Sequence, residues 1–443
     1  MLSFHRAHSA LGALILGLAC AADPSPPQHD LLRYYVDLDH PPSKRYQHVW
    51  DDFLRQHGTS AFSLTYAGWN SWLGLALPDL FGISAGVERA QAHRQAWLAA
   101  LQRSHPAVAE ELQALSTTLI AAGLNQELVS PPALAVAVSL YPILNIAAKN
   151  TTDTRPSACT STLARLASGA VLHGRSLDYE PRDSLAAATV VIDFMRQGAF
   201  EYRCLHPLPY VTGLQWFSCV RPGAFSLSVN ARSQGIHTEH NASFAELIRR
   251  LERPGANLLG EVAERAMQSE SYEAALAVLA SSRVVSSNYF ILAGAGGEGA
   301  VITRFGNSSA ADVWNLGPPD SDPEDGQPPW LRVQTNVDHW VTFSSGAYAT
   351  HRRQAVLNLI GSGGQQALNE EALLQAYLER RALAGSENRS RPEDTGAILR
   401  PSTIATLVLD PAASAEASPD PSKWRIWART PTILPPHDAQ ILV

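Results

Sequence analysis

The run from Cys159 to Asp178 constrains this chain more than any other segment. It places a cysteine in Cys159-Thr160-Ser161 and follows it, sixteen and nineteen residues later, with Arg175 and Asp178. A thiol, a guanidinium and a carboxylate at this spacing suit an amidase whose nucleophile lies at the edge of a β-hairpin. A thiol has an ordinary pKa near ~8.5, so it needs a base or an electropositive neighbour to attack an amide at neutral or acid pH.

The base for Cys159 is not a neighbouring histidine, because none stands beside it in the sequence. If the chain cuts itself between Ala158 and Cys159, the freed α-amino group has a reference pKa of roughly 7.7 to 8.0. That amine would accept a proton from the thiol of the same residue. A cysteine without such neighbours is ordinarily a small buried side chain with no reactive role. We therefore predict autocleavage between Ala158 and Cys159.

Several ordered motifs along the chain resemble one family. They are 36–39, 41–45, Cys159-Thr160-Ser161, His173-Gly174-Arg175 with Asp178, 222–227, 289–294, 301–304 and 334–340. In this order they are similar to the acid ceramidase and N-acylethanolamine acid amidase group of N-terminal nucleophile hydrolases, which are related to bile salt hydrolase and penicillin V acylase. The stretches around 306–330 and beyond about residue 385 match poorly, so nothing is carried over there.

The chain changes character at Cys159. The sequence before it is mostly helical in pattern, whereas runs of β-branched, alternating residues after it indicate strands with interspersed helices. This α+β order favours helices that cover stacked antiparallel sheets. The resemblance implies an αββα sandwich in which the nucleophile begins the first strand. We expect a signal peptide over 1–21, a helical α-subunit or propeptide region over 22–158, and a β-subunit over 159–443.

The patterns also predict individual elements. Apolar periodicity with proline starts and glycine stops predicts helices over 43–57, 87–103, 106–122, 132–148, 243–253, 272–280 and 351–360. β-Branched alternation predicts strands over 187–192, 200–205, 213–220 and 225–229. Polar or proline-rich loops are expected over 149–157, 318–329 and 411–421. The first of these loops would carry the scissile bond at its end.

The resemblance assigns electrostatic roles to Arg175 and Asp178. Asp178 would accept a hydrogen bond from the α-ammonium group of Cys159, and Arg175 would favour the thiolate. The plain alternative is a surface ion pair, which would contribute under ~1 kcal/mol to stability.

The same resemblance supplies donors for the tetrahedral intermediate. Asn336 matches the family's oxyanion asparagine, with Asp338 and Trp340 in support, although an asparagine capping a strand end would look the same. Arg352 matches a family arginine near the site and is a candidate substrate-binding residue. Where the family has a glutamate before an arginine, this chain has Ala231, which cannot titrate. The backbone N–H of Ala231 can still serve the oxyanion hole, whereas any control of cleavage by a carboxylate there would be lost.

A dense apolar stretch over 69–83 includes Trp69 and Trp72. It suits a lid that admits an acyl chain, a surface that rests on a membrane interface, or an ordinary helix core. We take Trp69 and Trp72 as candidate substrate-binding residues on the first of these interpretations.

The N-terminus has the pattern of a secretory signal. Arg6 lies in a short polar start, an apolar run covers 11–18, and the small residues Ala19-Cys20-Ala21 follow. The run is too short to span a membrane. Its removal would change the formal net charge from −7 to about −8, an acidic balance that argues against nucleic-acid binding. Sequons at Asn150, Asn241, Asn307 and Asn388 fit a glycosylated protein of the secretory pathway, in a lysosome- or vacuole-like compartment or outside the cell.

The cysteine count leaves one pairing open. Cys20 leaves with the signal and Cys159 is the expected nucleophile, so Cys204 and Cys219 remain. They form either one disulfide, which a secretory compartment permits, or two buried thiols, because facing positions across a hairpin are a demanding geometry.

The sequence and the resemblance together predict a self-processed cysteine N-acyl amide hydrolase. It would release a fatty acid from a lipid amide, such as a ceramide or an N-acylethanolamine, through a thioester. It would work as a cleaved α/β heterodimer, contact a membrane surface or lipid carrier, and need no cofactor or metal. The alternatives are an amidase of the bile-salt or penicillin acylase type and a secreted lipid-binding protein without activity.

Overall fold

The computed structural model describes residues 31–147, 157–214, 218–232, 243–318, 321–341, 348–361, 363–378, 402–412 and 425–428. The expected signal peptide, the sequons at Asn150, Asn241 and Asn388, and all but the last residue of the expected loop 149–157 lie outside these ranges.

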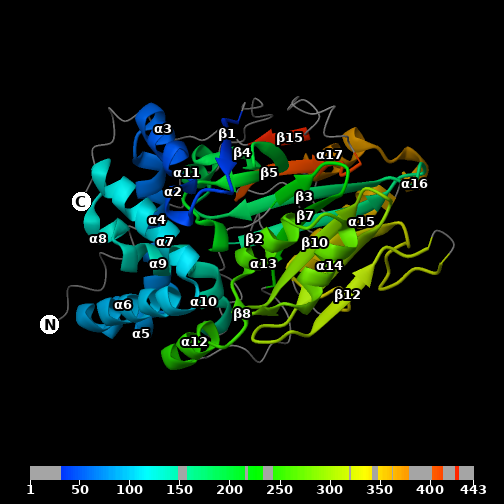
Figure 1. The fold of residues 1–443 in the computed structure, drawn as a ribbon. Helices are drawn as coiled ribbons and strands as arrows, with labels where there is room; N and C mark the ends of the chain where they lie inside the picture. The colour runs from blue at the N-terminus through cyan, green and yellow to red at the C-terminus, as the bar shows by residue number, and fades with distance from the viewer. Residues whose placement is uncertain are drawn as a thin grey trace, which may run out of the picture.

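The part of the chain before residue 148 is helical apart from its first strand, as the sequence predicts. β1 (Arg33–Asp37) opens it, and the helices gather at one end of the molecule (Figure 1). They are α2 (Pro42–Arg45), α3 (Gln47–His57), α4 (Ser60–Ala76), α5 (Pro78–Phe81), the 3₁₀ turn η1 (Ile83–Ala85), α6 (Val87–Ser104), α7 (Pro106–Ala121), α8 (Gln126–Val129), α9 (Pro131–Val138) and α10 (Leu140–Ala147).

Two helices that the sequence predicts as continuous are each divided. The expected helix 43–57 is interrupted at Tyr46, between α2 and α3. The expected helix 132–148 is interrupted at Ser139, whose Oγ accepts a hydrogen bond from Trp97 Nε1 at 3.0 Å. Proline inside a helix clashes with the carbonyl four residues earlier. The break at Ser139 puts Pro142 in the first turn of α10, where proline is tolerated.

Two β-sheets form the centre of the molecule. The larger has the strand order β1-β4-β5-β6-β7-β10-β11-β12, and the smaller has the order β13-β2-β3-β14-β15. Within the described residues, β1 pairs in parallel with β4 and the remaining pairs of these two sheets are antiparallel. The strands of the larger sheet after β1 are β4 (Thr189–Arg196), β5 (Ala199–Pro207), β6 (Ser218–Arg221), β7 (Phe225–Ala231), β10 (Asn288–Gly294), β11 (Gly299–Arg304) and β12 (Ala311–Asn315). Those of the smaller sheet are β2 (Ser157–Arg165), β3 (Val171–Tyr179), β13 (Leu331–Gln334), β14 (Thr403–Leu409) and β15 (Arg425–Ala428).

The strand predictions hold with two corrections. The run 187–192 is a strand only from Thr189, because Ala187 ends a helix. The run 213–220 is not one strand, because it starts inside the 3₁₀ turn η2 (Thr212–Leu214) and only its end belongs to β6. The remaining described elements are α11 (Arg182–Ala187), α12 (Phe244–Leu251), α13 (Leu259–Met267), α14 (Tyr272–Ser281), α15 (Tyr348–Gly361), α16 (Gly364–Ala367), α17 (Glu370–Leu378) and the short parallel pair β8 (Ala256–Asn257) and β9 (Arg283–Val284). Ser243 caps α12 by accepting a hydrogen bond from Glu246 N–H, as the sequence predicts.

The two sheets face each other, and helices cover their outer faces. Leu163 of β2 packs in one cluster with Tyr289 and Ile291 of β10. On the outer face of the smaller sheet, a Cβ at Gly174 would lie 2.8 Å from the ring of Tyr377 in α17, so only glycine allows this close approach. α13 and α14 lie over the larger sheet (Figure 1). The order of layers is therefore helix, sheet, sheet, helix.

The two cysteines of the larger sheet face each other on β5 and β6. Cys204 and Cys219 are register partners and form a disulfide. Cys159 is free and buried.

The apolar stretch 69–83 is mostly helix core. Trp69 of α4 is fully buried, donates from Nε1 to Glu180 O at 2.9 Å, and packs against Tyr210 and Tyr179. Trp72 is partly buried against the same core. Leu75 is the exception, with 77 % of its surface exposed. Trp69 therefore contributes to the packing of helices on the strands.

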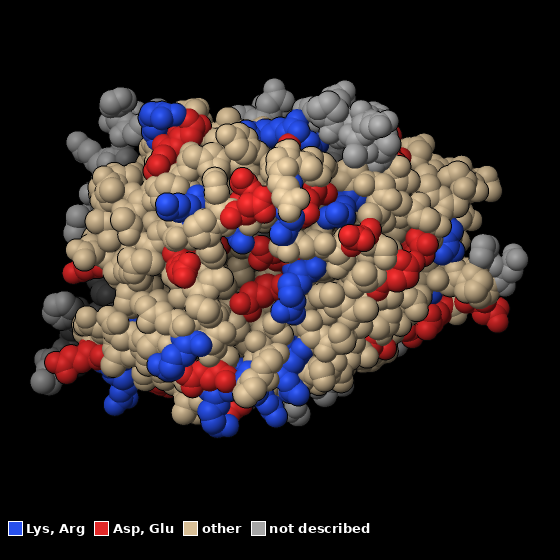
Figure 2. Space-filling model, in the orientation of Figure 1, with Lys and Arg blue, Asp and Glu red and all other residues tan. Residues whose placement is uncertain are grey.

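Charged groups alternate in sign on the face of the molecule drawn in Figure 2, where Lys and Arg side chains lie among Asp and Glu. Asn307, the one sequon asparagine within the described ranges, accepts a hydrogen bond at its Oδ1 from Arg253. Across those ranges, no helix combines enough length and hydropathy to cross a membrane.

Candidate active site

Cys159 lies near the start of β2 and is paired with Leu177 of β3. Side chains alternate along a strand. Cys159 and Ser161 point between the two sheets, as the contact of Ser161 Oγ with Ser228 Oγ at 3.1 Å indicates. Thr160 points the other way, toward α15. Cys159 is 1 % exposed, so the thiol is covered.

Three of the predicted site residues meet Cys159, each at a different atom. Its backbone N–H donates to Asn336 Oδ1 at 3.0 Å. Its carbonyl oxygen accepts from Arg352 Nη1 at 2.8 Å. Its Sγ accepts from Arg175 Nη2 at 3.5 Å. These four residues, which were predicted to share one site, lie up to 193 positions apart in the sequence. The fold brings them together.

The surroundings of the Cys159 thiol oppose its ionisation. Burial raises the pKa of Cys159 above its ordinary value, while the charge of Arg175 lowers it and that of Asp178 raises it further. Arg175 is itself buried, which lowers its own pKa, and it also donates to Asn230 Oδ1 at 2.9 Å. Because the pKa of Cys159 remains raised, the thiol is held mainly in its protonated form.

Asp178 lies on the opposite face of β3 from Arg175. Its Oδ1 accepts from Ser176 Oγ at 2.9 Å and from Thr403 Oγ1 at 2.7 Å. Asp178 is the register partner of Ala158, so it stands beside the backbone on the N-terminal side of Cys159. Thr403, which the sequence did not indicate, comes from β14 and helps to fix this carboxylate.

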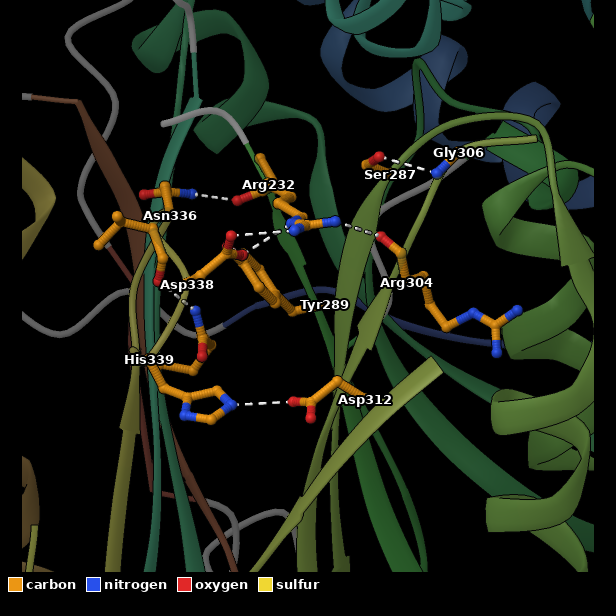
Figure 3. Close-up of polar contacts among 12 residues, drawn as sticks. Arg232, Ser287, Tyr289, Arg304, Gly306, Asp312, Asn336, Asp338 and His339 are labelled. Atoms are coloured by element: carbon orange, nitrogen blue, oxygen red, sulfur yellow. Dashed lines mark hydrogen bonds and ion pairs between the residues drawn. The ribbon is translucent and has the colours of Figure 1, made fainter. Parts of the chain in front are cut away.

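Both the oxygen and the nitrogen of the Asn336 side-chain amide form hydrogen bonds. Oδ1 accepts from Cys159 N–H and from the Arg352 guanidinium. Nδ2 donates to Ala231 O at 2.8 Å (Figure 3). Because Oδ1 faces two donors, the orientation of the amide is set by the network. The donor predicted for the oxyanion hole therefore points at the backbone of Ala231.

Ala231 ends β7 and is fully buried. The next residue, Arg232, is fixed by a bidentate ion pair with Asp338 at 2.7 and 2.9 Å (Figure 3). Tyr289 Oη donates to the same carboxylate at 2.7 Å. Asp338 thus supports the site through Arg232. Trp340, by contrast, is 44 % exposed and packs edge-on against His339.

Arg352 reaches the site from α15. Besides Cys159 and Asn336 it contacts Thr160 Oγ1, at 2.7 Å from Nη1. A guanidinium that donates to the carbonyl of Cys159 and to the side chain of Asn336 can align the two. The family resemblance predicted the position of Arg352, whereas the contact with Thr160 depends on how α15 packs over β2.

His173 is the histidine of the active-site hairpin, and it is buried away from the thiol. Its Nδ1 and Nε2 contact the hydroxyls of Ser226 and Ser228 at 3.0 and 2.8 Å. Burial lowers the pKa of His173 to about 3, so the ring stays neutral and packs between the sheets. Among the residues described, no group of three or more His, Cys, Asp or Glu side chains is arranged to hold a metal ion.

Comparison with known proteins gives several matches and no matching family model. The chain is 32 % identical over 218 residues to the N-acylethanolamine-hydrolyzing acid amidase of Cavia porcellus, covering 49 % of this chain and 56 % of that protein. It is 27 % identical over 331 residues to the protein of that name from Caenorhabditis elegans, covering 74 % and 79 %. It is 31 % identical over 198 residues to the acid ceramidase of Balaenoptera acutorostrata scammoni, covering 41 % and 46 %.

These alignments differ in extent. The chain spans about half the length of the mammalian relatives it matches and more of the nematode one. A solved structure of the Caenorhabditis elegans N-acylethanolamine-hydrolyzing acid amidase ortholog matches with a TM-score of 0.44 and 24 % identity, covering 61 % of this chain and 99 % of that one. The sequence matches show that the chain is distantly similar to proteins of the acid ceramidase and N-acylethanolamine-hydrolyzing acid amidase family.

Proposed function

We propose that this protein is a self-processed cysteine amidase that hydrolyses a lipid amide to a fatty acid and an amine. The substrate class is that of the relatives, a ceramide or an N-acylethanolamine. The fold would be that of an N-terminal nucleophile hydrolase, with 22–158 as the α-subunit and 159–443 as the β-subunit. The relatives and the disulfide favour the secretory pathway, with a signal peptide over 1–21.

The first reaction acts on the chain itself. Sγ of Cys159 attacks the carbonyl carbon of Ala158, and the peptide C–N bond breaks as the nitrogen of Cys159 takes up a proton. Water then hydrolyses the thioester, which leaves a carboxylate on Ala158 and a free α-amine and thiol on Cys159. Asp178, the register partner of Ala158, is suited to hold the new ammonium group.

The second reaction repeats the chemistry on the substrate. The α-amine of Cys159 accepts the thiol proton, and the thiolate attacks the amide carbonyl of the lipid. Asn336 Nδ2 and the N–H of Ala231 would stabilise the oxyanion. The amine leaves with the proton, and water releases the fatty acid from sulfur. Arg175, in contact with Sγ, favours the thiolate in both reactions.

One observation carries this proposal. The N–H, the carbonyl oxygen and Sγ of Cys159 are each held by a different residue of the set that the sequence predicted. A buried cysteine with only a packing role has no need of two guanidinium groups, which are costly to bury without a purpose.

Intact mass and N-terminal sequencing of the purified protein test the proposal. We expect two chains, one of which begins at Cys159. Cys159→Ala should give one uncut chain without amidase activity. If Cys159→Ala were cut at the same bond in a protease-free preparation, a residue other than Cys159 would be the nucleophile. An uncut and inactive wild-type chain at every pH would favour the non-catalytic alternative.

A further inference from the structure

Tyr141 belongs to the first turn of α10, the last described helix before the expected cut. Its side chain is 6 % exposed and lies in the main core. Its hydroxyl accepts a hydrogen bond from Arg232 N–H at 2.7 Å and donates one to Ser287 O at 3.1 Å. A residue of the helical region therefore touches the end of β7, where Ala231 lies.

The register of β7 and β10 explains what this hydroxyl replaces. Ala231 is the partner of Asn288, so the next pair in the antiparallel ladder would be Arg232 and Ser287. Such a pair would close by a direct bond from Arg232 N–H to Ser287 O. Instead, the oxygen of Tyr141 lies between the two groups and bonds to both. Ser287 is also held at its side chain, which accepts from Gly306 N–H at 2.8 Å (Figure 3).

The hydroxyl of Tyr141 and the amide of Asn336 hold opposite ends of one peptide group. Asn336 Nδ2 donates to the carbonyl oxygen of Ala231, and Tyr141 Oη accepts from the N–H of Arg232. Both atoms belong to the planar peptide unit between residues 231 and 232. Since the plane is rigid, a rotation at the Arg232 end moves the oxygen that orients Asn336.

We propose that Tyr141 is a positioning residue for the oxyanion hole, and this rests on the proposed function above. Its hydroxyl lies between Arg232 N–H and Ser287 O and keeps these two groups from bonding directly. In this way it sets the tilt of the 231–232 peptide. Because the oxygen of this peptide accepts from Asn336 Nδ2, the tilt orients the Asn336 amide toward the substrate carbonyl that Cys159 attacks. Through Tyr141, α10 would thereby help to position the catalytic groups on the strands that follow it in the sequence.

Without the hydroxyl, the buried Arg232 N–H would lose its acceptor and Ser287 O would lose the donor that Tyr141 supplies. Buried backbone groups are nearly always paired, so the two would close into a direct ladder bond. This closure turns the peptide and shifts the Asn336 amide. Misplacement of a catalytic group by about 1 Å can lower a rate by about 10²-fold.

Tyr141→Phe tests the proposal, with Tyr66→Phe as the matched control. Tyr66 is also a buried tyrosine of the helical region whose hydroxyl donates to a backbone carbonyl of the strand region, Pro209 O at 2.8 Å. The processed proteins would be assayed with a fluorogenic long-chain fatty-acyl anilide. We expect kcat of Tyr141→Phe to fall by about 10- to 100-fold with KM within about twofold. The melting temperature should equal that of Tyr66→Phe, whose kcat stays near that of wild type.

A second replacement at the same position separates positioning from packing. 4-Aminophenylalanine at position 141 restores a group able to bond to both Arg232 and Ser287, and it should recover most of the lost kcat. Equal kcat values for Tyr141→Phe and Tyr66→Phe, or no recovery with the amino group, would overturn the positioning role while leaving the amidase proposal intact. A wild-type protein that neither cuts itself nor hydrolyses the anilide would overturn both.

Discussion

Arg175 and Asp178 point to opposite faces of β3. The guanidinium of Arg175 lies between the sheets, against Sγ of Cys159 and Oδ1 of Asn230, whereas the carboxylate of Asp178 lies on the other face with Thr403. The two residues are three positions apart along the strand, and an odd offset reverses the face. The two side chains therefore do not form an ion pair. The Arg175 guanidinium contacts the thiol, whereas the Asp178 carboxylate accepts hydrogen bonds from Ser176 and Thr403.

Asn336→Ala should slow acyl transfer without unfolding the protein. The change removes the acceptor for Cys159 N–H and the side-chain donor of the oxyanion hole, and loss of one such donor lowers kcat by about 10²- to 10³-fold. Steady-state kinetics on the processed protein measure the effect. Asn257→Ala is the control, because the amide of Asn257 bonds to backbone carbonyls in β9 and the turn before β8. Turnover equal to that of the control would give Asn336 a structural role only.

Ala231→Glu should make processing depend on acid. The position is fully buried, so a carboxylate there loses its hydration and its pKa rises. The wild-type chain has no titrating group at this position, and we expect the rate of Cys159 exposure to vary little from acid to neutral pH. In the variant the rate should fall toward neutral pH as the carboxylate ionises. N-terminal sequencing over a pH series measures both profiles.

Two results of that series would contradict the expectation. A wild-type precursor that cuts only in acid would mean that another carboxylate supplies the switch. A wild-type precursor that stays whole at every pH, and is cut only after Ala231→Glu, would identify the natural chain as an inactive relative whose nucleophile is never released.

Glu111 of α7 should make stability depend on pH. Burial raises the pKa of Glu111 from 4.5 to about 8. The hydrogen bond from Thr212 N–H at 2.8 Å lowers this pKa, the charge of Glu264 raises it, and that of Arg45 lowers it. The folded state then binds more protons than the unfolded state between these two values, so the stability falls as pH rises from about 4.5 to about 8. Below pH 4.5 the penalty is absent.

Glu111→Gln keeps an acceptor for Thr212 and removes the titration. The melting temperature of wild type minus that of the variant should decrease from pH 4.5 to pH 8. Thermal melts in matched buffers measure this difference. A constant difference across the series would place the titration of Glu111 outside this range.

Removal of the disulfide should lower stability without stopping catalysis. The bond between Cys204 and Cys219 joins residues 15 apart in the sequence, and a closed loop of this size contributes roughly 3 kcal/mol in the chain-entropy model. Cys204→Ser with Cys219→Ser should lower the melting temperature and leave self-cleavage at Cys159 in place. A single-chain product in a folded variant would link the disulfide to the active site.

The sequence predicted the α+β order of helices and strands from local pattern, whereas the layers and the residues around Cys159 were predicted from the resemblance of ordered motifs to one family. Proline starts and apolar periodicity located α6 and α7 to within one residue at each end. The sequence did not predict the break between α9 and α10 at Ser139, because Ser139 bonds to Trp97, 42 residues away. The position of Asp178 relative to Arg175 follows from strand alternation, which the spacing contained.

The contacts that the sequence could not reveal are those between elements. Tyr141 carries no motif, and its hydroxyl matters only because α10 packs against the end of β7. Thr403 contacts Asp178 from the neighbouring strand β14, although the two are 225 residues apart in the sequence. A single chain without aligned relatives contains no signal for such pairs, since neither partner has a distinctive neighbour.

The pairing of β1 with β4 gives the proposed cut a consequence for refolding. β1 belongs to 22–158 and β4 to 159–443, and five residue pairs join them within one sheet. The disulfide lies wholly on the second side of the cut. After cleavage a single sheet would be shared by two polypeptides with no covalent link through it. Unfolding would then yield two molecules, and recovery of the native state would become second order in protein concentration. The precursor, still one chain, would refold at a rate independent of dilution.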